Sequence, residues 1–143
     1  MAERVFVDTN VLVYLRDSTE PGKQQAAAEW MSRLWDTGTG RLSAQVLQEY
    51  YVTVTAKLDP GLPAGDARED VLALRAWHPL EPDLELMERA WSMEDRWGFS
   101  FRDALIVAAA RQLDCDLLLT EDLQDGQDLE GLRVRNPFLH PPP

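Results

Sequence analysis

Two short segments in which every residue is apolar constrain the fold more than any other feature of the sequence. Residues 5–7 are Val-Phe-Val and residues 117–119 are Leu-Leu-Leu. A strand with one face in water alternates apolar and polar residues, whereas an unbroken apolar run is typical of a strand covered on both faces. Strands of this kind belong to parallel sheets with helices on each side. The chain is therefore expected to form an α/β fold of three layers, α/β/α, with a mostly parallel sheet.

Between these strands the apolar residues recur every three or four positions, which is the period of an amphipathic helix. In one example, Leu47, Tyr50, Tyr51, Val54 and Leu58 form a single stripe. The expected helices are residues 22–37, 44–58, 63–77, 83–97 and 101–113, with a further one beginning near residue 10. The expected strands are residues 5–7, 41–43, 116–120 and 132–135.

The composition fits a single globular domain over residues 1–143, with a frayed proline-rich tail at 139–143. Hydrophobic residues make up 45% of the chain and charged residues 27%, as in ordinary globular proteins. No apolar run approaches the roughly 20 residues that span a bilayer, and the N-terminus lacks a charged leader before an apolar stretch. We therefore expect a cytoplasmic protein without a membrane segment. One cysteine and two histidines are too few for a disulfide or a Cys/His zinc site.

Four acidic residues lie at or near the expected strand ends. Asp8 ends the first strand, Glu49 lies in the second turn of helix 44–58, Asp103 opens helix 101–113, and Asp122 follows strand 116–120. Taken singly, a cap or a turn accounts for most of them. Asp8 is the exception, because a carboxylate between two apolar stretches is rarely left unpaired. Parallel sheets bind ligands beyond the carboxyl ends of their strands, so we expect the four side chains to converge there.

Converging carboxylates require a positive partner. Two of them about 5 Å apart repel by roughly 3 kcal/mol at an effective dielectric constant of 20, so four need a cation or shared protons. Oxygen ligands without Cys or His select Mg²⁺, with Mn²⁺ as a substitute. Such a site suits phosphoryl chemistry, in which the cation activates water and neutralises phosphate charge.

Five segments of the sequence together resemble the PIN-domain family, and within it the VapC-type toxins of bacterial toxin-antitoxin pairs. They are VDTNVLVY at 7–14, SAQVLQEYY at 43–51, FSFRDALIVAAA at 99–110, LLLTEDLQDG at 117–126 and RVRNPF at 133–138. The resemblance implies a five-stranded sheet, Mg²⁺-dependent endoribonuclease activity on RNA, a cognate antitoxin and a homodimer. It also implies that Asp8, Glu49 and Asp103 are the three acidic residues of the metal site, with Asp122 in the more variable fourth position.

The same resemblance suggests supporting residues. Thr9 and Asn10 would orient the first acid and a bound water, and Thr120 would lie beside the fourth acid. The alternative is that all three simply satisfy local backbone groups. Glu121 and Asp125 are alternatives for the fourth acidic position, because both crowd that turn.

Arg102 is a candidate phosphate contact, although a solvated arginine on a helix surface is the favoured interpretation.

Phosphoaspartate receivers and haloacid-dehalogenase-like phosphatases use a lysine near a later strand end, whereas Lys23 and Lys57, the only lysines, lie in or near helices. The stronger alternative is a binding module with a weak or silent site. The net charge of −11 discourages RNA, and five tryptophans would fit an interface. Four acids in a repelling cluster nevertheless favour the enzyme.

Overall fold

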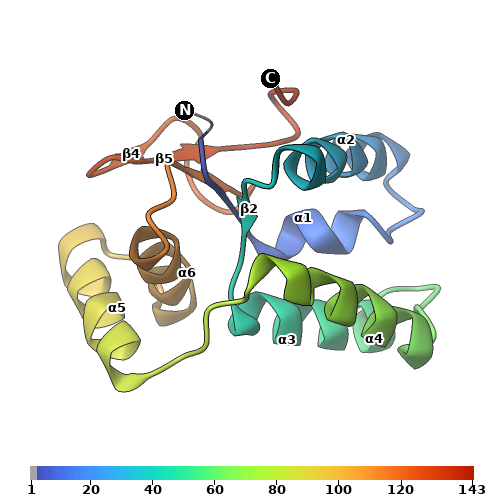
Figure 1. Ribbon diagram of the computed structural model, residues 1–143, viewed down its shortest axis with the longest axis horizontal. Helices are drawn as coiled ribbons and strands as arrows, with labels where there is room; N and C mark the ends of the chain where they lie inside the picture. Colours follow the sequence, from blue (N-terminus) through green and yellow to red (C-terminus); the bar gives the residue numbers. More distant parts are fainter. Residues whose placement is uncertain (1–2) are drawn as a thin grey trace.

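A five-stranded sheet lies between two groups of helices in the computed structural model, which describes residues 3–143 (Figure 1). The strand order is β2-β1-β3-β5-β4, and all neighbours are parallel except β4 and β5. The predicted three-layer α/β fold with a mostly parallel sheet is confirmed. The strands are β1 (Val5–Val7), β2 (Gly40–Arg41), β3 (Leu117–Leu119), β4 (Asp128–Leu129) and β5 (Leu132–Arg135).

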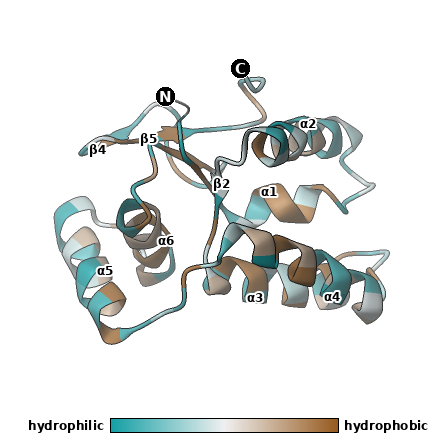
Figure 2. Ribbon diagram, viewed as in Figure 1, coloured by the Kyte–Doolittle hydropathy of each residue, from teal (hydrophilic) through white to brown (hydrophobic). Residues whose placement is uncertain are grey.

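Helices cover both faces of the sheet, with α1 to α4 on one side and α5 and α6 on the other (Figure 1). The α-helices are α1 (Thr9–Tyr14), α2 (Pro21–Thr37), α3 (Ala44–Val52), α4 (Ala64–Ala73), α5 (Leu84–Trp97) and α6 (Phe101–Gln112). Figure 2 shows hydrophobic residues on the central strands and polar residues on the outer helix surfaces. All three residues of β1 and of β3 are buried, as expected for strands covered on both faces. No helix in residues 3–143 is both long and apolar enough to span a bilayer.

Two predicted helices are divided in the structure. Helix 44–58 is α3 followed by the π-helix η1 (Thr53–Lys57), and helix 63–77 is α4 followed by the 3₁₀-helix η2 (Leu74–Trp77). Three consecutive β-branched residues at 53–55 have low helix propensity, and the backbone widens there into the π turn. The apolar periodicity does not reveal the change in helix type, because the buried stripe continues through it.

Strand β4 is absent from the sequence prediction. It forms a hairpin with β5 through the two-residue turn Glu130-Gly131, where both φ angles are positive, at 57° and 97°. Turns of this type usually carry Asn-Gly or Asp-Gly, so Glu-Gly gave a weak signal. The strand itself has only two residues, too few to show a period.

The C-terminal segment 139–143, predicted to fray, is attached at His140. The indole nitrogen of Trp30 donates a hydrogen bond to the His140 carbonyl at 2.8 Å, and the His140 ring lies 2.8 Å from the Asp125 carboxylate. Fraying of the last three prolines and a single domain over 1–143 stay predictions.

The register of the sheet places the carboxyl ends of β1 and β3 at the same level. Val7 is paired with Leu119, so the next residue of each strand, Asp8 and Thr120, leaves the sheet side by side. The Thr120 hydroxyl donates to Asp8 Oδ2 at 2.8 Å. The carboxyl edge of the sheet is thus where polar side chains enter an otherwise apolar core.

Candidate metal centre

Asp8 is the fixed point of the site. Its side chain is only 2% exposed and caps α1, accepting a hydrogen bond from the Thr9 backbone N–H at 2.7 Å. Thr120 and Asn10 also donate to Oδ2, at 2.8 and 3.4 Å. A buried carboxylate with this many donors is held in one orientation. The cap and the converging side chains were two alternatives from the sequence, and the structure shows both at once.

Asn10 links the two strand ends. Its side-chain amide donates to Thr120 Oγ1 at 3.0 Å and to Asp122 Oδ2 at 3.1 Å, and its carbonyl oxygen accepts from the Glu121 backbone N–H at 3.4 Å. Thr120 also accepts a hydrogen bond from the Asp122 backbone N–H at 3.0 Å. Asn10 and Thr120 therefore position acidic side chains as well as local backbone groups.

Glu49 reaches the site from the second turn of α3. The helix is capped by Ser43, whose hydroxyl accepts from the Val46 N–H. The Glu49 carboxylate accepts from the Thr9 hydroxyl at 2.6 Å. Its side chain is 30% exposed and lines a cleft, because Glu49 lies outside the apolar stripe of this helix.

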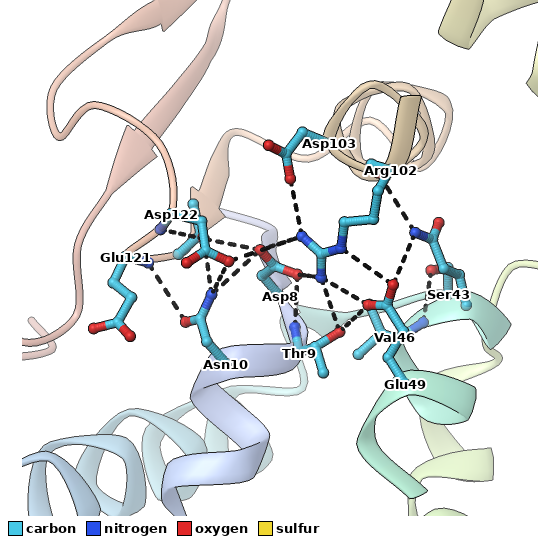
Figure 3. Close-up of polar contacts among 12 residues, drawn as sticks. Asp8, Thr9, Asn10, Ser43, Val46, Glu49, Arg102, Asp103, Glu121 and Asp122 are labelled. Atoms are coloured by element: carbon cyan, nitrogen blue, oxygen red, sulfur yellow. Dashed lines mark hydrogen bonds and ion pairs between the residues drawn. The ribbon is translucent and has the colours of Figure 1, made fainter. Parts of the chain in front are cut away.

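Asp103 lies in the first turn of α6, where its backbone N–H donates to the capping hydroxyl of Ser100 at 3.1 Å. The spacing from Ser100 to Asp103 is that of a capping box, in which the Asp103 carboxylate would accept a hydrogen bond from the Ser100 backbone N–H. It instead accepts from Arg102 Nη1 at 3.1 Å and points into the site (Figure 3). The pull of a positive charge is stronger than a neutral cap bond, so the side chain turns inward.

Arg102 lies at the centre of the acids, and its favoured interpretation as a solvated helix residue is wrong. Figure 3 shows the guanidinium between Asp8, Glu49 and Asp103. Its Nη2 donates to Asp8 at 2.8 Å and to Glu49 at 2.7 Å. The sequence contained a signal for this contact: converging carboxylates need a cation, and Arg102 is the basic residue adjacent to one of them.

Of the three acids predicted as candidates for the fourth position, Asp122 lies beside the cluster. Its Oδ2 lies 3.9 Å from Arg102 Nη1. Glu121 points away and accepts from Tyr14 Oη at 2.7 Å and from Lys23 Nζ at 2.9 Å. Asp125 is engaged elsewhere, with the Asn136 backbone N–H at 2.8 Å and with the C-terminal segment. Neither Glu121 nor Asp125 therefore lies in the cluster around Arg102.

Burial and charge act in opposite directions on the pKa values of the site. Burial alone would raise the pKa of Glu49, but hydrogen bonds from Arg102 and Thr9 outweigh it and hold that pKa below its ordinary value. Burial also disfavours the charged form of Arg102, yet its hydrogen bonds to Glu49 and Asp8 raise the pKa of the guanidinium further. The pKa of Asp122 is raised, by burial first and then by the negative charge of Asp8. The cluster therefore contains more negative charge than one arginine neutralises.

A cleft of about 620 Å³ opens beside these residues. The residues that line it include Thr9, Asn10, Glu49, Arg102 and Asp122, together with Lys57 of the π-helix. The π turn thus adds a positively charged side chain to the lining of the cleft. Helical irregularities of this kind often occur at functional sites.

The donor set fits a hard divalent cation. All four acidic side chains offer oxygen, the ligand atom that Mg²⁺ and Mn²⁺ prefer. Within residues 3–143, no three His, Cys, Asp or Glu side chains are gathered closely enough to hold a metal ion. The guanidinium of Arg102 stands between the carboxylates, so the chemistry of the ligands fits while their arrangement is centred on an arginine.

A parallel sheet with acidic residues at its carboxyl edge defines the class of fold, and comparison with known proteins gives the family. Residues 5–124 match the family model described as PIN domain. The chain belongs to the PIN-domain family. No sequence among curated proteins matches it.

Two solved structures are similar in fold. One is a toxin-antitoxin complex from Klebsiella pneumoniae, with a TM-score of 0.64 and 19% identity over 93% of this chain and 97% of that one. The other is Mycobacterium tuberculosis VapC20, a Sarcin-Ricin loop cleaving toxin, with a TM-score of 0.55 and 21% identity over 80% and 86% of the two chains. At these identities the likeness shows the fold.

Proposed function

We propose that this protein is a divalent-metal-dependent endoribonuclease and the toxin of a toxin-antitoxin pair. The observation that carries the proposal is the convergence of four carboxylates, from four separate segments, on the guanidinium of Arg102 beside a cleft. Membership of the PIN-domain family and the fold shared with VapC20 support it.

Asp8, Glu49, Asp103 and Asp122 would hold Mg²⁺, with Mn²⁺ as a substitute. When bound, the cation supplies Lewis-acid activation of water and neutralises the charge of a phosphodiester. Asp8 contributes a rigid position, because backbone and side-chain donors already fix both of its oxygens.

The other residues of the cleft would hold the substrate. Thr9 and Asn10 would orient the acidic side chains, and Lys57 on the cleft lining would offer a positive charge to an RNA phosphate. RNA binding by a chain with a net charge of −11 requires such local positive charge, so the cleft lining matters more than the overall balance.

The experiment that tests the proposal is cleavage of RNA by purified protein in Mg²⁺ or Mn²⁺. We expect EDTA to stop cleavage and Asp8→Asn to abolish it while circular dichroism remains unchanged. Asp70→Asn is the matched control, since it changes an acid of the same type outside the cleft. Full cleavage by Asp8→Asn would refute the mechanism.

The partners follow from the same proposal. A homodimer and a small cognate antitoxin are expected, in the cytoplasm where RNA is available, and the antitoxin in the Klebsiella pneumoniae complex supports the second of these. Light scattering measures the dimer. Expression in bacteria should arrest growth, and Asp8→Asn should relieve that arrest.

A second candidate function is a binding module without catalysis, and the central position of Arg102 favours it. The guanidinium is already a cation among the carboxylates. If the protein neither binds divalent cations nor cleaves RNA, the PIN-domain fold serves protein contacts and Arg102 is a permanent structural counter-ion.

A further inference from the structure

Every N–H group of the Arg102 guanidinium is engaged. A guanidinium has five N–H donors, and this one faces six acceptors within hydrogen-bond distance. Nε donates to Glu49 Oε2 at 3.1 Å. Nη1 donates to Asp8 Oδ2 at 3.3 Å and to Asp103 Oδ1 at 3.1 Å. Nη2 donates to Asp8 Oδ1 at 2.8 Å, to Thr9 Oγ1 at 3.2 Å and to Glu49 Oε1 at 2.7 Å.

The geometry is that of a double fork. Arg102 presents Nε and Nη2 to the two oxygens of Glu49, and Nη1 and Nη2 to the two oxygens of Asp8. Paired N–H donors match a carboxylate in both distance and direction, so bidentate contacts are the strongest that arginine makes. The same oxygens are those that a divalent cation would need.

We propose that Arg102 is a built-in counter-ion that closes the metal-free site, so that a divalent cation enters only when the guanidinium leaves. The proposal rests on the proposed metal-dependent function and adds a means of regulating that site. One positive group and one cation compete for the same carboxylate oxygens.

The cleft beside Arg102 can accommodate its side chain once the guanidinium is displaced. Arg102 lies in the first turn of α6, is 33% exposed, and already forms part of the cleft wall. Rotation of its long side chain outward would bring the guanidinium into the cleft, where its N–H donors become free for an RNA phosphate. In the closed arrangement those donors are saturated, so contact with phosphate and closure of the site exclude each other.

The first test is the metal affinity of Arg102→Met, measured by calorimetric titration of Mn²⁺ and Mg²⁺. A site closed for more than nine-tenths of the time has its apparent affinity lowered by about 10-fold or more. We therefore expect Arg102→Met to bind Mn²⁺ at least about 10-fold more tightly than the wild type. Arg16→Met, which removes an arginine paired with Asp70 outside the site, should leave the affinity unchanged.

Thermal unfolding provides a second readout. Without metal, Arg102→Met should melt at a lower temperature than the wild type, because the carboxylates then repel each other without a counter-ion. Saturating Mg²⁺ should raise the melting temperature of Arg102→Met by more than that of the wild type. An equal rise in both proteins would contradict competition between metal and arginine.

A third measurement is made on the wild type and covers the case in which Arg102→Met does not fold, with the conservative variant Arg102→Lys used only to assign the signal. In protein labelled with ¹⁵N-arginine, the Nε–H signal of Arg102, assigned by its loss in Arg102→Lys, should shift on addition of saturating Mg²⁺. Bound Mg²⁺ with an unchanged Arg102 signal would overturn the inference and leave the metal-dependent function standing. Absence of metal binding in both the wild type and Arg102→Met would instead overturn the proposed function.

Discussion

Two arginine and carboxylate clusters in this protein differ in their balance of charge. Arg16 forms a bidentate pair with Asp70, with Nε 2.9 Å and Nη2 2.6 Å from its two oxygens, and Tyr50 Oη donates to the same carboxylate. Here one arginine meets one acid. At the carboxyl edge of the sheet, Arg102 meets four acids.

The difference distinguishes a structural ion pair, whose charges balance, from a site whose negative charge is only partly neutralised. In the balanced pair, burial would raise the pKa of Asp70, but hydrogen bonds from Arg16 and Tyr50 hold it below its ordinary value. In the other cluster the pKa of Asp122 is raised, since burial and the Asp8 charge exceed what Arg102 offsets. At the edge of a cleft, this excess negative charge would favour exchange of the single charge of Arg102 for a divalent cation.

The largest expected difference between the clusters is in catalysis. Asp103→Asn should lower the rate of RNA cleavage by more than about 100-fold, beyond the 10- to 100-fold typical of residues that only support a metal ligand. Asp70→Asn should leave the rate within about 2-fold, because its carboxylate serves the fold. Initial rates on a fluorogenic RNA measure both. Equal losses in the two variants would remove the distinction between the clusters.

The balanced pair should matter more for stability. Asp70→Ala leaves Tyr50, whose side chain is buried, without its acceptor, and an unsatisfied buried donor costs about 1–3 kcal/mol. For a domain of this size, each kcal/mol lowers the melting temperature by roughly 2–4 °C. Calorimetry measures the shift, with the exposed pair-forming residue Glu85, changed to Ala, as the control expected to show little loss. A melting temperature unchanged in Asp70→Ala would show that water replaces the lost partner.

Acid should weaken both clusters in the same direction. The folded-state pKa values of Glu49 and Asp70 lie below their ordinary values of 4.5 and 3.8. The stability from these contacts is therefore fully present above about pH 4.5 and is lost as the pH falls through the lower, folded-state pKa values. Urea unfolding between pH 7 and pH 3 measures the loss, which should be smaller in Asp70→Asn than in the wild type.

The smallest expected effect is a gain in stability. Because the pKa of Asp122 is raised, its ionised form is disfavoured in the folded state, and this penalty is present at neutral pH and disappears as the carboxyl is protonated. Asp122→Asn should melt slightly higher than the wild type at pH 7 without metal, and the two should converge in acid. With saturating Mg²⁺ the order should reverse if Asp122 is a ligand. A lower melting temperature at pH 7 in metal-free buffer would contradict excess negative charge.

Much of the fold could be predicted from local patterns. The apolar runs 5–7 and 117–119 are β1 and β3, and the predicted helix 101–113 is α6. The division of helix 44–58 and the two-residue strand β4 could not, because a π turn keeps the apolar stripe and a strand of two residues shows no period.

The candidate site, like the fold, could be predicted only in part. The sequence by itself determined where the acids stand along the chain, since Asp8 follows a buried strand and Asp103 opens a helix, and such positions depend on neighbours within a few residues. Only the tertiary structure decided that Asp122, rather than Glu121 or Asp125, lies in the cluster and that Arg102 fills its centre. A long side chain is directed by charges that other elements bring to it, and those charges come together only when the sheet has formed.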